Sequence, residues 1–225
     1  MVAVAIDGPS GAGKSTIAKA AAKQLGLIYV DTGALYRTVG YAMAREGTNL
    51  DDEDAVKQVL SRIRVTFSYE QGSQRVYLNG EDVSEKIRTP EMSMMASRVS
   101  ALSSVRVFLL DLQRDTAKRQ SVIMDGRDIG TVVLPDADVK IFLTASPQIR
   151  AKRRHQELVE KGQQVTFEEV LNDVLQRDYN DSHREIAPLK QADDAVLLDT
   201  SGYTLEKSIE EVVRIIKEAA PCSIK

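Results

Sequence analysis

Short apolar segments alternate with longer segments of helical periodicity along most of the chain, and this alternation strongly restricts the fold. The apolar segments are Val2–Ile6, Leu27–Val30, Ser121–Met124, Val139–Leu143 and Ala195–Leu198. Most are rich in β-branched or large aliphatic side chains, which is typical of strands buried on both faces of a parallel sheet. The helical patterns between them include Lys14–Leu25, Val105–Arg119 and Thr204–Ala219. Strands separated by helices predict an α/β fold, in which a five-stranded parallel sheet is covered by helices on both faces.

The segment that joins the first predicted strand to the first predicted helix reads Gly8-Pro-Ser-Gly-Ala-Gly-Lys-Ser15. It matches the P-loop pattern GxxxxGK[ST], and both flanking elements are of the right type. Glycines let several backbone N–H groups point at one phosphate, and the helix N-terminus adds partial positive charge. The predicted ATP-binding residues are Gly8, Pro9, Ser10, Gly11, Ala12, Gly13, Lys14, Ser15 and Thr16.

Within this loop, Lys14 is placed to reach the β- and γ-phosphates, and the Ser15 hydroxyl is placed to ligate Mg²⁺. The motif predicts the phosphoryl donor and not the acceptor. By itself it leaves GTPases, ATPases and small-molecule kinases open.

Composition excludes several other classes of protein. A formal net charge of -3 argues against a general binder of nucleic acid or anionic membranes, because such binders need a basic face. The single cysteine, Cys222, cannot form a disulfide within the chain. No apolar run approaches the length of a membrane span, and the N-terminus lacks the pattern of a signal peptide. We therefore expect a cytoplasmic protein.

One segment that breaks the alternation is 61–102. The runs Val65–Tyr69 and Val76–Leu78 alternate like antiparallel strands, with turn residues at 71–73 and at Asn79-Gly80. Short polar helices are expected around Glu81–Lys86 and Pro90–Ser100. We predict that this segment is a lobe inserted into the main domain.

A second break, at 150–162, is dense in arginine and lysine. Arg150, Arg153 and Arg154 have the spacing that places them on one face of a helix. Such a face is often only solvated surface. In a chain whose net charge is negative, we favour a lid whose guanidinium groups close over the triphosphate. The predicted division is a core of 1–60, 103–149 and 163–225, an inserted lobe at 61–102 and a lid at 150–162.

The predicted second strand ends in the sequence Asp31-Thr-Gly-Ala-Leu-Tyr-Arg37. The carboxyl ends of parallel strands face the ligand crevice of such folds. Arg37 is therefore a candidate for an acceptor phosphate, with Thr32 and Tyr36 lining the site. The alternative is that these residues bind no ligand. Thr32 would then be a helix N-cap, Tyr36 a packed side chain and Arg37 a solvated one.

The third predicted strand ends in Asp125-Gly-Arg-Asp128, at the same edge. Arg127 and Asp128 are candidates for contacts with a phosphate and with a base or sugar. Asp125 stands where many P-loop proteins carry a carboxylate near the Mg²⁺ shell, and it is a candidate outer-shell residue. An Asp-Gly turn is the alternative.

Further along, Arg177, Asp181 and Arg184 fall on one face of a predicted helix. They lie near enough to one another to clasp a small ligand, and an exposed ladder of ion pairs is the alternative.

Taken together and in order, these motifs resemble those of bacterial cytidylate kinases, which belong to the nucleoside monophosphate kinases among the P-loop NTPases. The resemblance runs from Val2 to about Thr200 and rests on Gly8–Ser15, Asp31–Arg37, Gly126–Val133 with Pro135–Ala137, and Arg177–Asp178 with Ala187–Leu189. It implies a three-layer α/β/α core with an enlarged nucleotide-binding lobe and a lid. It also implies transfer of the γ-phosphoryl group of ATP, with Mg²⁺, to CMP or dCMP.

By matching position, the resemblance also implies an acceptor site. Its residues are Thr32, Tyr36, Arg37, Ser97, Arg106, Arg127, Asp128, Arg177, Asp181 and Arg184. Phosphate contacts are implied for Arg37, Arg127 and Arg184, and sugar contacts for Asp181 with Arg177. Base contacts are implied for Ser97, Arg106 and Asp128. We predict four catalytic residues, which would stabilise the charge of the transition state: Lys14, Arg150, Arg153 and Arg154.

Two alternatives remain at this point. A kinase for another acceptor, such as UMP, AMP or a metabolite alcohol, is the nearer one, although several arginines favour an acceptor that carries phosphate. A GTP-binding switch would read guanine with an Asn-Lys-x-Asp motif, and the sequence contains none. We expect a monomer with ATP and CMP or dCMP as its small-molecule partners, and neither nucleic acid nor a membrane.

Overall fold

A computed structural model describes residues 1–70 and 73–220. Its main sheet has five strands in the order β2-β6-β1-β7-β8, and every neighbouring pair is parallel. The strands are β1 (Ala3–Asp7), β2 (Ile28–Asp31), β6 (Val122–Gly126), β7 (Val139–Thr144) and β8 (Val196–Asp199). The five predicted strands are confirmed, with ends that differ by at most two residues.

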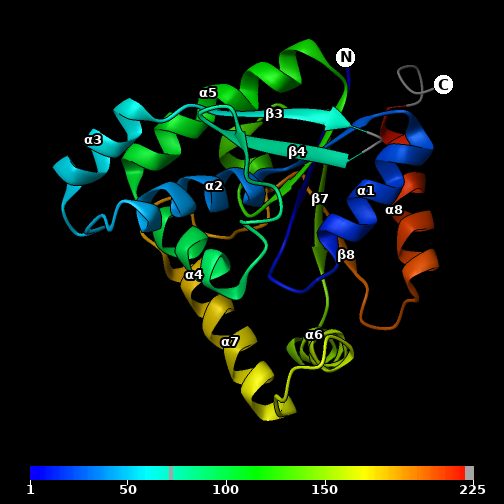
Figure 1. The fold of residues 1–225 in the computed structure, drawn as a ribbon. Coiled ribbons are helices and arrows are strands. Elements are labelled where there is room, and N and C mark those ends of the chain that lie inside the picture. The colour runs from blue at the N-terminus through cyan, green and yellow to red at the C-terminus, as the bar shows by residue number, and fades with distance from the viewer. Residues whose placement is uncertain (71–72, 221–225) are drawn as a thin grey trace.

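Helices cover both faces of this sheet (Figure 1). On one face, α1 (Lys14–Leu25) and α8 (Leu205–Ala219) pack against Val4 and Ile6 of β1. On the other face, α5 (Ser103–Arg119) and the turn η1 (Ile129–Val133) pack against Ala5 and Met124. Val4 and Ile6 face one layer while Ala5 faces the other, because successive side chains of a strand alternate. The predicted three-layer α/β/α fold is confirmed.

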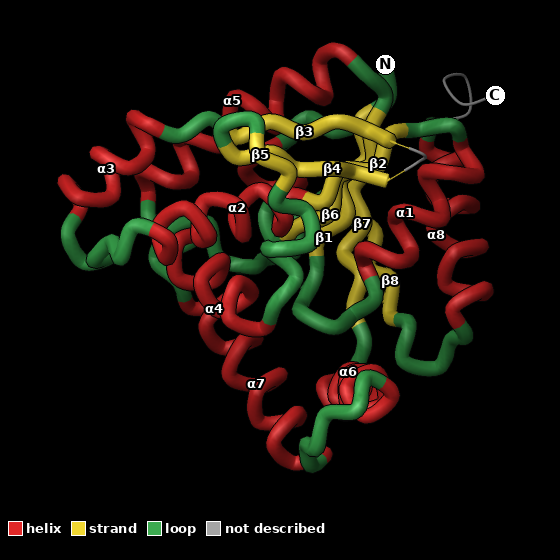
Figure 2. Tube along the Cα trace, viewed as in Figure 1, coloured by secondary structure: helices red, strands yellow, loops and turns green. Residues whose placement is uncertain are grey.

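The segment 61–102 contains a small antiparallel sheet, visible above α2 in Figure 2. It consists of β3 (Val65–Glu70), β4 (Ser73–Leu78) and β5 (Glu81–Asp82), and α4 (Pro90–Val99) follows it. The predicted hairpin and the helix near Pro90 are confirmed. Of the turn expected at 71–73, residues 71–72 lie outside the described residues, as does the cysteine at position 222.

The prediction of a helix around Glu81–Lys86 is wrong. Residues 81–82 form β5, which pairs with Tyr77 and Leu78 of β4. The reason lies in Asn79 and Gly80, whose φ angles of 51° and 86° form a tight hairpin turn. This turn returns the chain alongside β4, and the Ser84 hydroxyl then accepts a hydrogen bond from the Val76 N–H.

The small sheet shares one hydrophobic core with the helices beside it. Leu35 and Val39 of α2 (Thr32–Arg45) are buried together with Val65, Val76 and residues of α3 (Glu53–Arg62) and α5. The antiparallel sheet is therefore packed against the α2–α5 layer by apolar side chains.

Two further helices, α6 (Pro147–Glu160) and α7 (Phe167–His183), pack against each other through Ala151, Val170 and Val174. A capping box begins α7, since the side chains of Thr166 and Glu169 each accept a hydrogen bond from the backbone N–H of the other residue. Over the described ranges, 1–70 and 73–220, no helix is both long and apolar enough to cross a membrane.

Packing against the small sheet generates a prediction about stability. Leu109 of α5 is fully buried in the core that α2, α5 and the small sheet share. We expect Leu109→Ala to lower the free energy of unfolding by about 2–5 kcal/mol, because it removes apolar contacts and leaves a cavity. Urea denaturation measures this. Leu197→Ala is the control, since Leu197 of β8 is 57% exposed. Equal losses in the two variants would contradict this description of the core.

Candidate active site

The site is built where three strands of the sheet end at the same level. In the register of the sheet, Asp31 of β2 lies opposite Asp125 of β6, and Asp7 of β1 lies opposite Gly126 of β6. Residues far apart in the sequence therefore meet at one edge, as predicted for the carboxyl ends of parallel strands.

The predicted ATP-binding loop follows β1 directly. Its first glycine, Gly8, has φ 151°, and a Cβ there would lie 1.9 Å from the carbonyl oxygen of Leu143. Only glycine fits at this close approach to β7. Residues 8–13 form the loop, while Lys14, Ser15 and Thr16 form the first turn of α1. Gly13 is the N-cap and has no side chain to bond the first N–H groups, which suits an anion-binding helix terminus.

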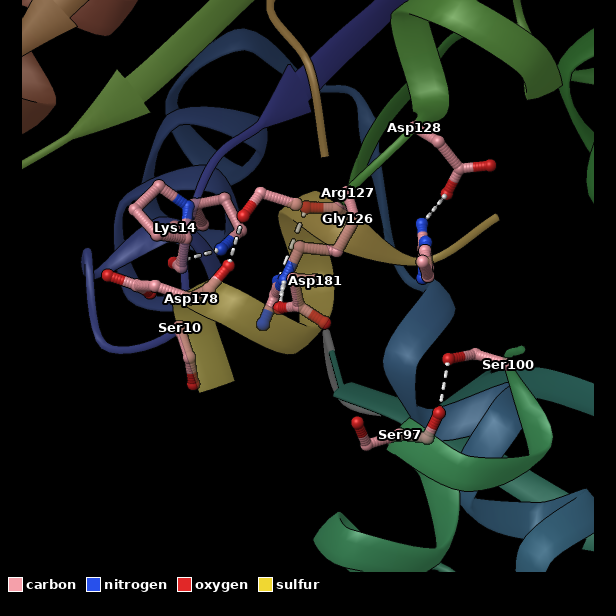
Figure 3. Close-up of polar contacts among 12 residues, drawn as sticks. Ser10, Lys14, Ser97, Ser100, Gly126, Arg127, Asp128, Asp178 and Asp181 are labelled. Carbon is pink, nitrogen blue, oxygen red and sulfur yellow. Dashed lines mark hydrogen bonds and ion pairs between the residues drawn. The ribbon is translucent and has the colours of Figure 1, made fainter. Parts of the chain in front are cut away.

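The Lys14 side chain lies within the loop and is only 5% exposed. Its Nζ donates a hydrogen bond to the Pro9 carbonyl oxygen at 2.8 Å (Figure 3). Burial lowers the pKa of Lys14, and the nearby Arg127 guanidinium lowers it further. A polyphosphate bound at this loop would supply the missing counter-charge and favour the protonated amine.

Ser15 and Asp125 place side-chain oxygen atoms beside this loop. The Ser15 hydroxyl donates to Asp125 Oδ2 at 2.8 Å, and the Tyr29 hydroxyl donates to Asp125 Oδ1 at 2.9 Å. Burial raises the pKa of Asp125, and the nearby Asp31 raises it further. The Thr32 hydroxyl donates to the Asp125 backbone oxygen at 2.7 Å, which joins the ends of β2 and β6.

These oxygens fit a magnesium ion that is held mainly by nucleotide phosphates. Mg²⁺ prefers hard oxygen ligands and usually takes only one or two from protein side chains. In the part of the chain that the structure describes, no group of three or more His, Cys, Asp or Glu side chains could hold a metal ion. A hydroxyl with a carboxylate behind it therefore suits a nucleotide-bound Mg²⁺ better than a metal held by protein alone.

The predicted acceptor residues form a series of arginine–carboxylate pairs. Arg37 Nη2 lies 2.7 Å from Asp31 Oδ2, and Arg127 Nε lies 2.7 Å from Asp181 Oδ2. Asp128 is buried and pairs with Arg106. In the view of Figure 3, Arg127 and Asp181 lie between Lys14 and Asp128.

Asp128 also connects this cluster to the end of α7, because Arg184 Nη2 lies 3.5 Å from its Oδ1. The prediction that Arg184 shares a helix face with Arg177 and Asp181 is wrong, since α7 ends at His183 and Arg184 has an extended backbone. Arg106 reaches the end of α4 as well, where its Nη1 donates to the Ser100 carbonyl oxygen at 3.2 Å. The backbone oxygen of Ser97 accepts a hydrogen bond from the Ser100 hydroxyl. This chain of contacts links α4, α5, the end of β6 and α7.

Tyr36 lies against the same cluster, with its ring centroid 5.8 Å from the Arg106 guanidinium carbon. Burial raises the pKa of Tyr36. Arg177 forms its ion pair within its own helix. Its Nη2 lies 3.2 Å from Asp173 Oδ2, one turn away on α7.

The three arginines of the predicted lid have three different surroundings. Arg150 is 2% exposed, and its Nη1 donates both to the Ser10 carbonyl oxygen and to Asp178 Oδ1, each at 2.9 Å. It thereby ties the P-loop to α6 and α7, and Figure 3 shows Ser10 and Asp178 beside Lys14. Arg153 donates to the Thr200 carbonyl oxygen at 2.9 Å, and Arg154 pairs with Glu157 on its own helix.

Two carboxylates of this region were missed by the sequence analysis. Asp178 is the partner of Arg150. Asp7, at the end of β1, is 5% exposed and accepts hydrogen bonds from the backbone N–H groups of Ile129 and Gly130. The available signal for Asp7 was a carboxylate at a strand end, immediately before the first glycine of the loop.

Comparison with known proteins gives consistent results. The sequence model of the family described as cytidylate kinase matches residues 4–218. The "Cytidylate kinase" of Thermosipho melanesiensis is 48% identical over 215 residues, which cover 96% of each chain. That of Caldicellulosiruptor saccharolyticus is 49% identical over 212 residues, which cover 94% of each.

A solved structure of an uncharacterized protein from Eubacterium ventriosum is similar in fold, with a TM-score of 0.52 at 12% identity. It covers 96% of this chain and 99% of that one. Since the family match spans both the P-loop and the acceptor residues, the chain belongs to the cytidylate kinase family.

Proposed function

We propose that the protein transfers the γ-phosphoryl group of ATP to CMP or dCMP and releases ADP with CDP or dCDP. The observation that carries this proposal is the family match over almost the whole chain, which includes the arginine cluster at the strand ends. Six predicted acceptor residues take part in the ion pairs of that cluster: Arg37, Arg106, Arg127, Asp128, Asp181 and Arg184. Arg127 and Asp181 are close enough to the P-loop lysine to affect its pKa.

On the donor side, residues 8–16 hold the triphosphate with backbone N–H groups, and Lys14 moves its amine from the Pro9 oxygen to the phosphates. Ser15 would hold the Mg²⁺ ion, with Asp125 behind it. That ion would neutralise charge on the β- and γ-phosphates. No protein nucleophile is required, because the acceptor phosphate oxygen attacks in line.

On the acceptor side, we assign the phosphate to Arg37, Arg127 and Arg184. Each guanidinium faces a carboxylate in the structure, which holds it in place until a phosphate arrives. Planar guanidinium groups suit the paired oxygens of a phosphate. The sugar is assigned to Asp181 with Arg177.

The base is assigned to Ser97, Arg106 and Asp128. Cytosine presents an exocyclic amine, which needs an acceptor such as the Asp128 carboxylate. Its O2 and N3 need a donor, which Arg106 supplies. Uracil places a carbonyl oxygen where cytosine has the amine, so the same carboxylate repels it.

We further propose that residues 61–102 and 150–162 move toward the core of 1–60, 103–149 and 163–225 when both substrates bind. Such closure excludes water and so prevents hydrolysis of ATP. Arg153 and Arg154 lie in α6 and would approach the donor phosphates. Arg150 already bonds the P-loop at Ser10, from where it would support transition-state charge. We also propose that the protein acts as a cytoplasmic monomer.

A panel of acceptors tests the proposed function. Purified protein with ATP and Mg²⁺ is given CMP, dCMP, UMP or AMP, and ADP release and the diphosphate product are both measured. We expect kcat/KM for CMP or dCMP to exceed that for AMP and UMP about tenfold or more. A preference for AMP or UMP, or ADP release that no acceptor stimulates, would contradict the proposal.

The burial of Lys14 generates a prediction. We expect Lys14→Ala to lower kcat by about a hundredfold or more, because it removes the amine that meets the transferred phosphate. The fold is retained, because burial already disfavours the charged amine. Steady-state kinetics and circular dichroism measure the two effects. Lys23→Ala, at the exposed end of the same helix, is the control. A folded Lys14→Ala variant with normal kcat would remove Lys14 from the mechanism.

The position of Asp128 generates a prediction about specificity. Asp128→Asn replaces the charged acceptor by an amide, which can present either its oxygen or its NH₂ group. We expect kcat/KM for CMP to fall by about ten- to a hundredfold. The value for UMP falls much less or rises, since the repulsive carboxylate is gone. The CMP/UMP ratio is the measurement, and a parallel loss for both substrates would show that Asp128 does not read the base.

A further inference from the structure

Asp7 is a buried carboxylate that the proposed mechanism does not use. It is the last residue of β1 and directly precedes Gly8. Its Oδ1 accepts the Ile129 N–H at 2.8 Å, and its Oδ2 accepts the Gly130 N–H at 2.7 Å. Both oxygens therefore bond consecutive N–H groups at the start of η1.

Burying the Asp7 carboxylate lowers the stability of the folded state. Burial raises the pKa of Asp7 to about 6, against the favourable effect of the two backbone N–H groups. A carboxylate removed from water is unfavourable unless hydrogen bonds replace its hydration. Polar groups that break the ordinary burial rule commonly occur at functional sites. The geometry indicates what Asp7 does, because two parallel hydrogen bonds fix both the position and the orientation of the segment they hold.

The segment that Asp7 holds carries two of the proposed acceptor residues. Arg127 and Asp128 lie between Gly126, the last residue of β6, and Ile129. The chain turns back sharply here, since a Cβ on Gly126 would lie 2.7 Å from the Ile129 side chain. Asp128 is adjacent to Ile129, so a shift of the Ile129 N–H moves the Asp128 backbone with it.

A different residue holds the far end of η1. Arg114 of α5 donates from Nη2 to the Val132 carbonyl oxygen at 2.9 Å and from Nε to that of Val133 at 3.0 Å. The turn is thus anchored at both ends. Asp7 holds the two residues that directly follow Asp128, while Arg114 holds Val132 and Val133, whose N–H groups donate to the Asp128 carbonyl oxygen at 2.9 and 3.2 Å. Arg114 therefore offers a matched control.

The donor loop is held by separate contacts. β1 pairs with β6 and β7 on its two sides, and Arg150 bonds the Ser10 carbonyl oxygen. These contacts do not involve the Asp7 side chain, so its loss leaves them in place.

We propose that Asp7 is a positioning residue for the acceptor nucleotide. It fixes the segment that bears Arg127 and Asp128, so that the phosphate and the base of one nucleoside monophosphate are held at the same time. Asp7 acts on the nucleotide through this segment, since each of its oxygens accepts a hydrogen bond from one of the backbone N–H groups that follow Asp128. This assignment rests on the proposed function.

The test compares Asp7→Asn with Arg114→Met. Asparagine has the same shape as aspartate, but its amide oxygen can accept only one of the two N–H groups while its NH₂ faces the other. We expect KM for CMP to rise about tenfold or more and the CMP/UMP ratio of kcat/KM to fall, while KM for ATP changes less than about twofold. Arg114→Met lowers the melting temperature but leaves both KM values within about twofold.

Three results would overturn the assignment. One is an equal rise of KM for CMP in Arg114→Met, which would mean that any loosening of η1 suffices. Another is a lower kcat in Asp7→Asn with both KM values unchanged, which would place Asp7 in the chemical step. The third is wild-type kinetics in a folded Asp7→Asn variant.

If the Asp7→Asn variant does not fold, hydrogen exchange in the wild-type protein tests the proposal instead. In the wild-type protein, the amide hydrogens of Ile129 and Gly130 should exchange about as slowly as those of β6, and fast exchange would contradict the proposed anchor. If the wild-type protein prefers another acceptor, the proposed function fails instead. The same KM comparison with that acceptor then still tests Asp7.

Discussion

The register of β2, β6 and β1 is the constraint on which the rest of the site depends. Parallel hydrogen bonding sets Asp31 opposite Asp125 and Asp7 opposite Gly126, so that three strand ends lie side by side. A slip of one residue would turn every side chain of a strand to the other face of the sheet. Apolar residues on both faces, such as Val4 and Ala5, prevent that slip because each packs into its own core.

This edge concentrates charge, and the structure balances it within the chain. Arg37, Arg127 and Arg184, the three arginines proposed for the acceptor phosphate, each pair with a carboxylate of the site. Breaking a buried pair leaves an uncompensated charge, which costs several kcal/mol, about 3–5 in measured cases. An incoming phosphate therefore has to replace a carboxylate as the partner of these arginines. In our account this exchange selects for a phosphate-bearing acceptor, since a neutral alcohol offers no such replacement.

Features that depend on neighbouring residues could be predicted from the sequence, and contacts between distant residues could not. The strands and the P-loop follow from apolar runs, periodicity and glycine spacing, all of which are short-range signals. The expected helix at 81–86 is wrong because Asn79 and Gly80 form a tight turn that continues the sheet. The partners of Arg150 could not be predicted, because helical spacing shows which residues share a face and not what that face meets. Asp7 was missed because its partners are backbone N–H groups of residues far along the chain.

The central claim is that arginines at the strand ends form a phosphate site, with Asp128 and Arg106 beside it for the base. Calorimetric titration of the protein with CMP and with cytidine, in the absence of ATP, tests this claim most directly. We expect CMP to bind about a hundredfold more tightly than cytidine, because charge-assisted hydrogen bonds to its phosphate are the strongest contacts available. The difference should shrink as salt is added. Equal affinities for CMP and cytidine would contradict the account.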